Sequence, residues 1–429
     1  MSLTHGASEH GAPRTSYHVR KMTHTPDKVL DFPPIHPDAW LLDPAVTFLN
    51  HGSFGACPRA VFDRQQQLRA EMEREPVEFL VRKMPPLLDE SRGALAELIN
   101  ADPADVAFVQ NATAGVNSVL RSIDFQPGEE ILVTDHDYNA CRNVARYVAE
   151  RTGAVVVEAK VPTPVESAGQ VIDAVLARIT PRTRIAMLDH VTSPTAIVFP
   201  MEEIARELER RGVDALIDGA HAPGMIPLDM NRIGAAYYAG NCHKWLCAPK
   251  GAGFLHVRPD RQQGIQPPIV SHGWNRPRSG YSPFQDAFDW PGTLDPTPWL
   301  CVAAAIRFVG TLLDGGLAAL MRRNHGLAIR ARHILCQRLD VAPLCAESLL
   351  GSMAAVRLPD EMAMPYAASA TLGCNAADRL HDELLARFGI ETPVYFWPEE
   401  PKTILRVSAQ AYNHAEQYEK LADVLKEMG

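Results

Sequence analysis

The sequence lacks several signatures that would place it in a class at once. Its eight cysteines are scattered through 429 residues without a C-x-x-C pair, which excludes a disulfide-stapled scaffold and favours a reducing, cytoplasmic setting. No apolar run approaches the length of a membrane span, and no signal peptide is visible. Basic residues are not in excess either, because the net charge is -9. This balance argues against nucleic acid as the main partner.

Nucleotide and metal motifs are also missing. No G-x-G-x-x-G follows an apolar run and no P-loop is present, so a nicotinamide- or nucleotide-binding sheet is disfavoured. His136, Asp137 and Cys141 lie close together, but no second ligand cluster matches them, and we expect no metal. Hydrophobic residues make up 46% of the chain, an ordinary composition for a protein with two or three domains.

Short apolar runs alternate with amphipathic segments from about residue 50 to residue 257. We expect buried strands at 105–110, 130–135, 154–159, 184–191, 214–220 and 251–257. Helix candidates lie between them, such as 201–212, which Gly212 would end. This alternation predicts an α/β fold with a mainly parallel sheet. Ligands of such sheets bind beyond the carboxyl ends of the strands.

The chain divides into three predicted parts. Residues 1–30 are polar and lack apolar periodicity, so we expect a flexible arm. Residues 31–310 would form a large domain, in which the Pro- and Trp-rich region 266–298 predicts long ordered loops and 271–284 would shape the substrate pocket. Residues 311–429 would form a small C-terminal domain with a strand at 403–408 and a final helix capped by Asn413 and Glu416.

Polar residues that directly follow the predicted strands are candidates for a binding site. Thr113 follows 105–110 in a turn that opens a helix, where it could help to seat a phosphate or could merely cap the helix. His136 or Tyr138, after 130–135, could stack on a planar ring or fill a loop gap. Asp218 emerges from an apolar strand, where a protonated pyridine nitrogen would be a suitable partner and a helix cap is the alternative.

The stretch AGNCHKWLCAPKGAGFLHV, residues 239–257, places Lys244 among small, aromatic and aliphatic residues. A buried ammonium group is costly unless it is paired, neutral or covalently used. Lysine forms a Schiff base with an aldehyde, and an aspartate such as Asp218 keeps a pyridine nitrogen protonated. Together with a phosphate seat, this indicates pyridoxal 5'-phosphate. A surface position for Lys244, or Lys250 as the Schiff-base residue, is the alternative.

The ordered set NHGSFG, NATAGVN, DHDY, DGAHAPG and GNCHKWLCAPKGAGFL resembles the class V aminotransferase family of pyridoxal-phosphate enzymes, and within it an amino-acid epimerase subgroup. The resemblance covers roughly residues 40–425. It implies the type I fold of these enzymes, in which a large domain with a mainly parallel mixed sheet carries a small α+β domain. Residues 31–48 would pack on the small domain, and the protein would be a homodimer.

The resemblance also implies a role for individual residues around the cofactor. Lys244 would form the Schiff base, Asp218 would pair with the pyridine nitrogen, and His221 would approach the ring hydroxyl. The residues implied to hold the phosphate are Ala112, Thr113, Asn241 and His243. Asn241 stands where the family usually has serine, and its amide can still donate a hydrogen bond.

Further cofactor and substrate contacts follow from the same resemblance. Tyr138 would stack on the ring with His136 in reserve, and Ser193 would make a polar contact to the cofactor. Gly292 and Thr293 would reach the phosphate of the neighbouring subunit. Arg406 would grip the α-carboxylate of an amino-acid substrate, because the guanidinium group binds carboxylates in a bidentate way. Ser53 is the second residue expected to bind the substrate.

The reaction stays open at this point. Epimerisation needs proton removal on one face of the α-carbon and return on the other, with Lys244 as one base and Tyr138 or His51 opposite. A carbon–sulfur lyase that acts on a cysteine thioether or sulfoxide begins with the same step, and an aminotransferase or a non-enzymatic protein with this fold is less favoured. A desulfurase needs a cysteine shortly before Arg406. Residues 389–406 contain none, and Cys374 lies further upstream.

Overall fold

The computed structural model describes residues 32–360, 362 and 376–428. The predicted arm at residues 1–30 and Cys374 lie outside these residues. The described chain forms three sheets, which contain seven, three and two strands. The predicted boundary between a large and a small domain at residue 310 stays a prediction.

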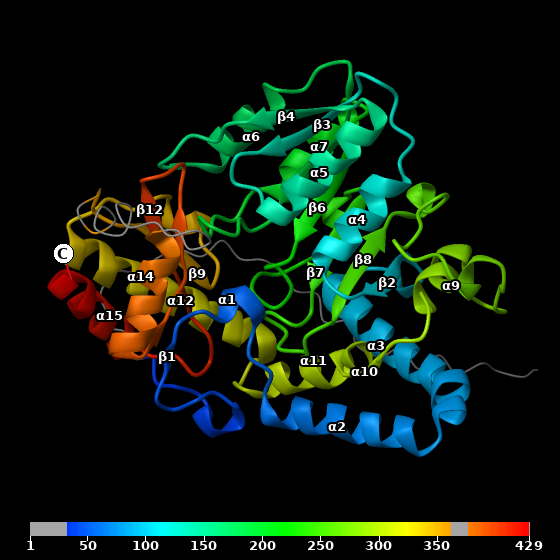
Figure 1. The fold of residues 1–429 in the computed structure, drawn as a ribbon, viewed down its shortest axis with the longest axis horizontal. Coiled ribbons are helices and arrows are strands. Elements are labelled where there is room, and N and C mark those ends of the chain that lie inside the picture. The colour runs from blue at the N-terminus through cyan, green and yellow to red at the C-terminus, as the bar shows by residue number, and fades with distance from the viewer. Residues whose placement is uncertain (1–31, 361, 363–375, 429) are drawn as a thin grey trace, which may run out of the picture. The chain divides into compact units, whose positions relative to one another are not determined.

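The seven-stranded sheet has the order β2-β8-β7-β6-β5-β3-β4 (Figure 1). Strand β8 runs antiparallel to β2 and β7, whereas the other pairings are parallel. The strands are β2 (Val106–Val109), β3 (Glu130–Thr134), β4 (Val155–Ala159), β5 (Thr183–Asp189), β6 (Asp214–Gly219), β7 (Tyr237–Asn241) and β8 (Gly253–Val257). The predicted α/β fold with a mainly parallel mixed sheet is confirmed.

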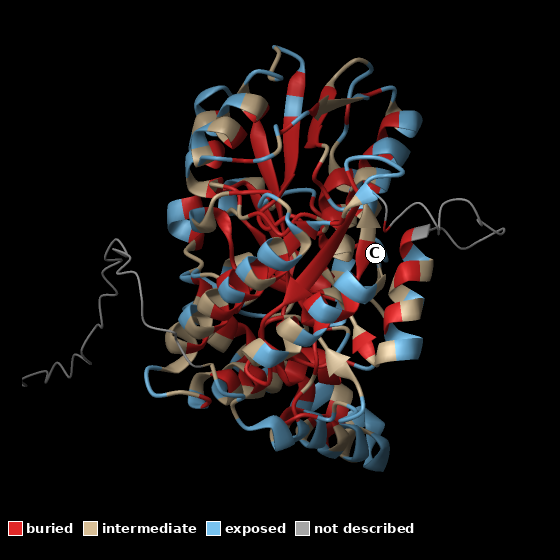
Figure 2. Ribbon diagram, turned by 90° about the vertical axis from the view of Figure 1, so that its left-hand side faces the viewer, coloured by how far each residue is buried: buried red, intermediate tan, exposed pale blue. Residues whose placement is uncertain are grey.

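Both faces of this sheet are buried except at the edge strand β4, which is mostly half-buried or exposed, and Figure 2 shows the buried strands in red. Successive residues of β6 illustrate the alternation, because Ala215 and Ile217 join one apolar cluster and Leu216 joins the other. Helices α4 (Ala112–Ser122) and α5 (Asn139–Thr152) belong to the second cluster, and α7 (Met201–Arg210) to the first. Burial on both faces explains why the strands are continuous apolar runs in the sequence.

Six of the seven strands of this sheet coincide with predicted runs to within two residues at either end. Strand β7 was not predicted, because its sequence YYAGN is short and carries a glycine where a strand would place an apolar side chain. At Gly240 a Cβ would collide with the ring of Phe254 on β8, so the glycine allows the two strands to pair closely.

The C-terminal part holds the two smaller sheets. Strands β9 (Met353–Arg357), β11 (Val394–Phe396) and β12 (Thr403–Ser408) are antiparallel, and β1 (Thr47–Phe48) pairs in parallel with β10 (Ile390–Glu391). The predicted strand 403–408 is confirmed. The helices beside them are α12 (Gly316–Leu339), α14 (Ala376–Phe388) and α15 (Ala415–Met428).

The predicted capping box of the last helix is wrong. Helix α15 begins at Ala415, and the side-chain oxygen of Asn413 accepts a hydrogen bond from the Gln410 amide, at 3.0 Å, instead of capping the helix. Asn413 therefore closes the turn that leads into the helix. Glu416 points into solvent, with 86% of its side chain exposed.

The remaining helices surround the sheet and the site. They are α1 (His51–Phe54), α2 (Arg59–Arg74), the π-helix η2 (Glu78–Lys83), α3 (Met84–Ile99), α6 (Ala168–Leu176), α8 (Met230–Ile233), α9 (Pro283–Asp289), α10 (Thr297–Leu300) and α11 (Val302–Thr311), with 3-10 turns at Pro37–Ala39, Pro103–Asp105, Pro259–Arg261, His272–Trp274 and Glu347–Leu349. The region 266–298 therefore contains short helices as well as loops. Within the described chain no single helix could cross a membrane by length and composition, although Thr297–Thr311 and Gly316–Leu339 pass that test together, bent by 68°.

Candidate active site

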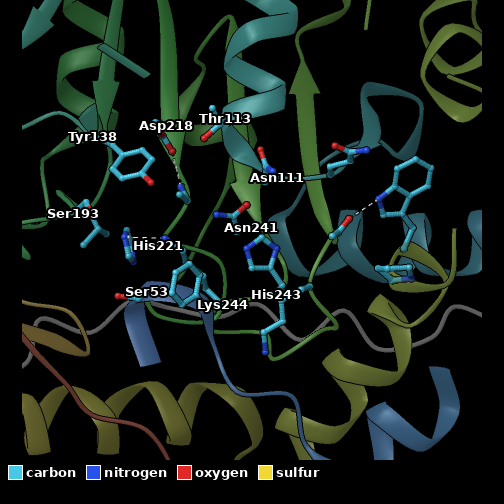
Figure 3. A pocket seen from close by; sticks show the side chains of 18 of the residues that line it. Ser53, Asn111, Thr113, Tyr138, Ser193, Asp218, His221, Asn241, His243 and Lys244 are labelled. Carbon is cyan, nitrogen blue, oxygen red and sulfur yellow. Dashed lines mark hydrogen bonds between the residues drawn. The ribbon is translucent and has the colours of Figure 1, made fainter. Parts of the chain in front are cut away.

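A cavity of about 530 Å³ opens at the carboxyl ends of β5, β6 and β7. This is the edge of a parallel sheet at which a ligand is expected. Figure 3 shows side chains from several elements converging on it. The predicted site residues among its lining are Ser53, Thr113, Tyr138, Ser193, Asp218, His221, Asn241, His243 and Lys244.

Lys244 lies in the turn that joins β7 to β8. Its ammonium nitrogen is 3.1 Å from Nε2 of His221. Burial and the positive charge of Arg406 together lower the pKa of Lys244 from 10.5 to about 7, against the opposing effect of Asp218. A substantial fraction of the lysine is therefore neutral near pH 7. Neutral amine is the form that attacks a carbonyl or removes a proton.

A close backbone approach fixes the position of this turn. Gly55, at the end of α1, has φ 70 and packs directly on the Lys244 backbone. A Cβ at residue 55 would overlap the carbonyl oxygen of His243 and lie 2.9 Å from Cα of Lys244. Only glycine satisfies both the left-handed backbone and this contact.

Asp218 lies near the end of β6 and His221 follows the strand, and both are at least 97% buried. The Asp218 carboxylate accepts hydrogen bonds from the Cys141 thiol at 3.0 Å and from the Ala220 amide at 2.9 Å. Burial raises the pKa of Asp218. Burial and the nearby charge of Lys244 lower the pKa of His221 well below its usual value, so its imidazole is neutral. Its Nδ1 is buried and makes no hydrogen bond within the described chain.

The first turn of α4 and the end of β7 form the other end of the cavity. The Asn111 side chain caps α4 by accepting from the Ala114 amide at 2.8 Å. The side-chain oxygen of Asn241 accepts from the Ala112 amide, also at 2.8 Å. Asn241 therefore keeps its NH₂ group for a ligand, while the Ala112 amide is already paired. A helix N-terminus beside such donors suits an anion.

His243 completes this end. Its Nδ1 bonds to the Ala252 carbonyl oxygen at 2.9 Å, so Nδ1 carries a proton and donates. Burial lowers the pKa of His243 to about 4. In the neutral ring Nε2 is an acceptor. The ring must take up a proton before Nε2 can donate to an anion.

Tyr138 immediately precedes α5. Its side chain lines the cavity together with that of Asp218 (Figure 3). Its backbone amide donates to the Asp189 carboxylate at 3.1 Å. The residue is 42% exposed. Burial raises the pKa of the phenol, as do the neighbouring Cys141 and Asp218. The phenol is therefore protonated at neutral pH and can donate a proton.

Arg406, on β12, lies behind two serines that line the cavity. Its guanidinium donates to the Ser193 carbonyl oxygen at 2.6 Å and to the Ser53 hydroxyl at 3.1 Å. Arg406 is 1% exposed, and its Nε makes no hydrogen bond within the described chain. A buried guanidinium without a carboxylate partner is costly. The side chain thus has unused capacity for an anionic group.

Several predicted site residues lie elsewhere. His51 is fully buried behind Lys244, with Nδ1 2.8 Å from the Tyr412 hydroxyl and Nε2 3.0 Å from the Lys244 carbonyl oxygen. His136 is also fully buried, and its Nδ1 bonds to the Thr195 hydroxyl at 2.8 Å. Neither ring is among the described residues that line the cavity. The structure therefore gives both histidines positions in the supporting framework, where they do not face a ligand.

Two loops that were predicted to contribute to the site do not line the cavity of this chain. Gly292 and Thr293 do not line the cavity of their own chain, although the next residues, Leu294 and Asp295, do. Their contact with a neighbouring subunit stays a prediction. The predicted role of 271–284 in shaping the pocket is not seen in this chain, because none of these residues lines the cavity.

The structure also adds residues that the prediction omitted. Asp189 at the end of β5 lines the cavity and is 3% exposed. Its sequence signal was the same as that of Asp218, a carboxylate at the end of an apolar strand. The other additions are Phe54, Gln110, Asn111, Val191, Ala220, Gly251, Leu294, Asp295, Pro298 and Trp299, and Lys250, the alternative Schiff-base residue, also lines the cavity.

The class V aminotransferase family model matches residues 57–350. The chain belongs to the class V aminotransferase family. It is 39% identical over 404 residues to isopenicillin N epimerase of Amycolatopsis lactamdurans, a match that covers 90% of this chain and 96% of the relative. It is 30% identical to a probable chloroplastic L-cysteine desulfhydrase of Arabidopsis thaliana, covering 89% and 83%. These matches confirm the family and the epimerase likeness that the motifs indicated.

The fold of this class V protein is also that of solved structures. A cystine C–S lyase in complex with cysteine persulfide superposes with a TM-score of 0.73 at 22% identity, over 90% of this chain and 98% of the other. This likeness shows the type I fold of pyridoxal-phosphate enzymes. The family depends on pyridoxal 5'-phosphate. The residues present fit this cofactor, because the cavity places an amine, a buried carboxylate and an anion-binding helix N-terminus around one space.

Proposed function

We propose that this protein is an amino-acid epimerase that inverts the α-carbon of its substrate. The observation that carries the proposal is that two proton carriers of different chemistry, Lys244 and Tyr138, line one cavity (Figure 3). They come from different elements, the β7–β8 turn and the start of α5. The 39% identity to an isopenicillin N epimerase supports the same reaction class.

The chain's own residues would hold the cofactor at three points. Lys244 would bond to its aldehyde carbon, and Asp218 would pair with the pyridine nitrogen, for which a buried carboxylate is suited. The phosphate would lie at the N-terminus of α4, against Thr113, Asn241 and the protonated ring of His243. When bound, pyridoxal phosphate supplies an electron sink that makes the α-proton of an amino acid acidic.

The substrate end would be built around Arg406. Its guanidinium is held by Ser193 and Ser53 at the cavity edge, and it would bind the substrate's α-carboxylate. Fixing the carboxylate orients the α-hydrogen toward a proton carrier. The Nζ atom of Lys244 would remove the proton on one face, with the neutral His221 ring 3.1 Å away. The phenol of Tyr138 would deliver a proton on the other face and would be left as the phenolate, which is the form that would remove the α-proton of the opposite enantiomer.

A carbon–sulfur lyase is the second candidate, because a desulfhydrase is also among the relatives. The lyase shares the first proton removal and then loses a β-substituent. Within the described chain no cysteine lines the cavity, which disfavours a persulfide mechanism. Cys374 lies outside the described residues.

Proton NMR in deuterium oxide separates the two reactions. The cofactor-loaded enzyme would be given isopenicillin N and a panel of L-amino acids that includes cysteine thioethers and sulfoxides. Loss of the α-proton signal with the skeleton intact, and growth of the second epimer, is the expected result. Release of pyruvate with loss of the sulfur group would establish the lyase instead.

We also propose that the working enzyme is a homodimer in the cytoplasm, in which Gly292 and Thr293 reach the partner's phosphate. Mixed dimers test the arrangement. Lys244→Ala and Thr293→Trp chains would each be inactive alone. Co-expressed, they form one intact site from Lys244 of one chain and Thr293 of the other, so activity returns. If the loop serves its own subunit, mixing restores nothing.

A further inference from the structure

Two carboxylates stand side by side at the cavity wall. Asp189 ends β5, and Asp218 lies next to it on β6, because the two are paired in the register of these parallel strands. Side chains at paired positions of neighbouring strands point to the same face. Both residues line the cavity, and each is 3% exposed.

The two carboxylates differ in their hydrogen bonds. Asp218 accepts from the Cys141 thiol and from the Ala220 amide, so each of its oxygens has a donor. Asp189 accepts from the Tyr138 amide through Oδ2, whereas its Oδ1 is buried without a hydrogen-bond partner within the described chain. An ionised carboxylate needs donors on both oxygens when it is buried. The environment therefore suits the ionised form at Asp218 better than at Asp189.

Charged and titratable groups face Asp189 from every neighbouring element. Asp218 comes from β6, Asp137 from the loop after β3, and Tyr138 and Cys141 from the start of α5. Lys244 comes from the β7–β8 turn. Burial and the negative charges of Asp218 and Asp137 raise the pKa of Asp189 well above its usual value, against the opposing effect of the Tyr138 and Ser193 backbone amides. Adjacent buried carboxylates do not readily ionise together.

A third buried carboxylate, that of Asp137, holds the loop after β3 in place. Asp137 accepts from the Thr134 amide and hydroxyl, each at 2.7 Å, and from the Asp189 amide at 3.1 Å. Burial raises the pKa of Asp137 to about 7. Asp137 thus ties the end of β3 to the end of β5, and Asp189 ties the end of β5 to Tyr138. The segment that presents the Tyr138 ring depends on both.

We propose that Asp189 keeps its proton in the cofactor-loaded enzyme, which leaves Asp218 as the ionised carboxylate for the pyridine nitrogen and makes Asp189 a neutral residue that positions Tyr138. The inference rests on the proposed cofactor and not on which reaction follows. A second ionised carboxylate beside Asp218 would compete for the ring proton. A neutral acid keeps the hydrogen bond to the Tyr138 amide without adding charge.

Infrared difference spectroscopy tests where the proton resides. The carbonyl stretch of a neutral carboxylic acid is separate from the bands of carboxylates and shifts in deuterium oxide. Spectra of wild type, Asp189→Asn and Asp218→Asn would be recorded at neutral pH, with and without pyridoxal phosphate. Asp260→Asn is the matched control, because Asp260 is half exposed and its hydrogen bond with Arg258 lowers its pKa.

The expected result is an acid-band component in the loaded wild-type enzyme that is missing in Asp189→Asn and retained in Asp218→Asn and Asp260→Asn. A component from Asp137, whose pKa is raised to about 7 by burial, would be common to all four spectra. Loss of the band in Asp218→Asn with retention in Asp189→Asn, or no acid band in the loaded wild type, would overturn the proposal. Cofactor binding is followed separately by its visible absorbance. Failure to bind would refute the cofactor assignment, while the spectra without cofactor would still report whether Asp189 is protonated.

A comparison of side chains tests the positioning role. Asparagine at residue 189 keeps an oxygen for the Tyr138 amide, whereas alanine does not. We expect Asp189→Asn to bind the cofactor within about threefold of wild type and Asp189→Ala to bind about tenfold more weakly, because a hydrogen bond to a buried amide is lost. The circular dichroism of the bound cofactor should change in the alanine variant only. Equal effects of both substitutions would contradict this role.

Discussion

The Nζ atom of Lys244 and the Nε2 atom of His221 are 3.1 Å apart, and burial disfavours the charged form of both groups. The pKa of Lys244 is lowered to about 7 and that of His221 well below its usual value, in each case mainly by burial. A neutral amine beside a neutral imidazole is an unusual arrangement for a structural lysine. It suits an amine that must react with an aldehyde and then transfer protons.

Replacement of Lys244 should abolish covalent attachment of the cofactor. After incubation with pyridoxal phosphate and reduction with borohydride, mass spectrometry of the wild type should find the adduct on Lys244, and Lys244→Ala should carry none at the site. Lys250→Ala is the control, because Lys250 also lines the cavity and donates to the Gly55 carbonyl oxygen at 2.7 Å. It should keep the adduct. An adduct on Lys250 in the Lys244→Ala variant, or loss of the adduct in Lys250→Ala, would assign Schiff-base formation to Lys250.

Aldehyde capture by cofactor-free protein should depend on pH with a midpoint near 7. The reactive form is the neutral amine, so the rate rises as pH increases through the pKa of Lys244, about 7, and then levels off. Stopped-flow absorbance measures this. Arg406→Met should move the midpoint upward, because one positive neighbour is removed. A rate that continues to rise toward the ordinary lysine pKa of about 10.4 would contradict a buried, perturbed amine.

His51 should contribute to stability in a pH-dependent manner. Burial lowers its pKa from 6.5 to about 3 in the folded protein. The unfolded chain therefore binds a proton that the folded chain does not between these values, and stability is lost as pH falls below about 6.5. His51→Asn should destabilise by about 2–4 kcal/mol at pH 7, because the contacts to Tyr412 and Lys244 are broken.

The same variant should be less harmful in acid. At pH 5 the wild type has lost about 2 kcal/mol of this contribution, and His51→Asn has none to lose. Urea unfolding of cofactor-free protein at the two pH values measures the difference. A penalty that is equal at both would show that His51 titrates alike in folded and unfolded chains.

Gly55→Ala should displace the lysine turn, whereas Gly128→Ala should not. Both glycines have positive φ, 70 and 85, so each alanine incurs a backbone cost of about 1 kcal/mol. At Gly128 no atom lies within 4 Å of the added Cβ, but at Gly55 it collides with the backbone of His243 and Lys244. We expect Gly55→Ala to lower the free energy of unfolding by at least about 2 kcal/mol more and to weaken cofactor binding. Thermal unfolding and absorbance titration would measure both.

The parallel sheet was predictable because its strands are buried on both faces and appear as apolar runs. The polar residues near the strand ends were predictable as site residues because ligands bind at the carboxyl ends of parallel strands. The structure brings Thr113, Tyr138, Asp218 and Lys244 to one cavity. Asp189 carries the same signal as Asp218, a carboxylate two residues before the end of a predicted apolar strand, and its place in the cavity wall follows from its register with Asp218 on the neighbouring strand.

The positions of the buried histidines could not be predicted from sequence. His51 bonds to Tyr412, which lies 361 residues further along the chain, and no local pattern reports such a contact. His136 is two residues from Tyr138, but the turn sends its ring toward Thr195 and Trp397 and away from the cavity. Direction in a turn depends on dihedral angles that the residue type alone does not set.

The most direct test of the epimerase proposal is α-proton exchange from each enantiomer separately. In deuterium oxide, wild-type enzyme should exchange the α-proton of both enantiomers of its substrate, as measured by proton NMR. Tyr138→Phe keeps a ring beside the cofactor and loses the phenol proton, so it should still exchange the enantiomer whose proton faces Lys244 while exchange of the other falls by at least about 100-fold. Equal exchange of both enantiomers in Tyr138→Phe would contradict the assignment of Tyr138 to the second face.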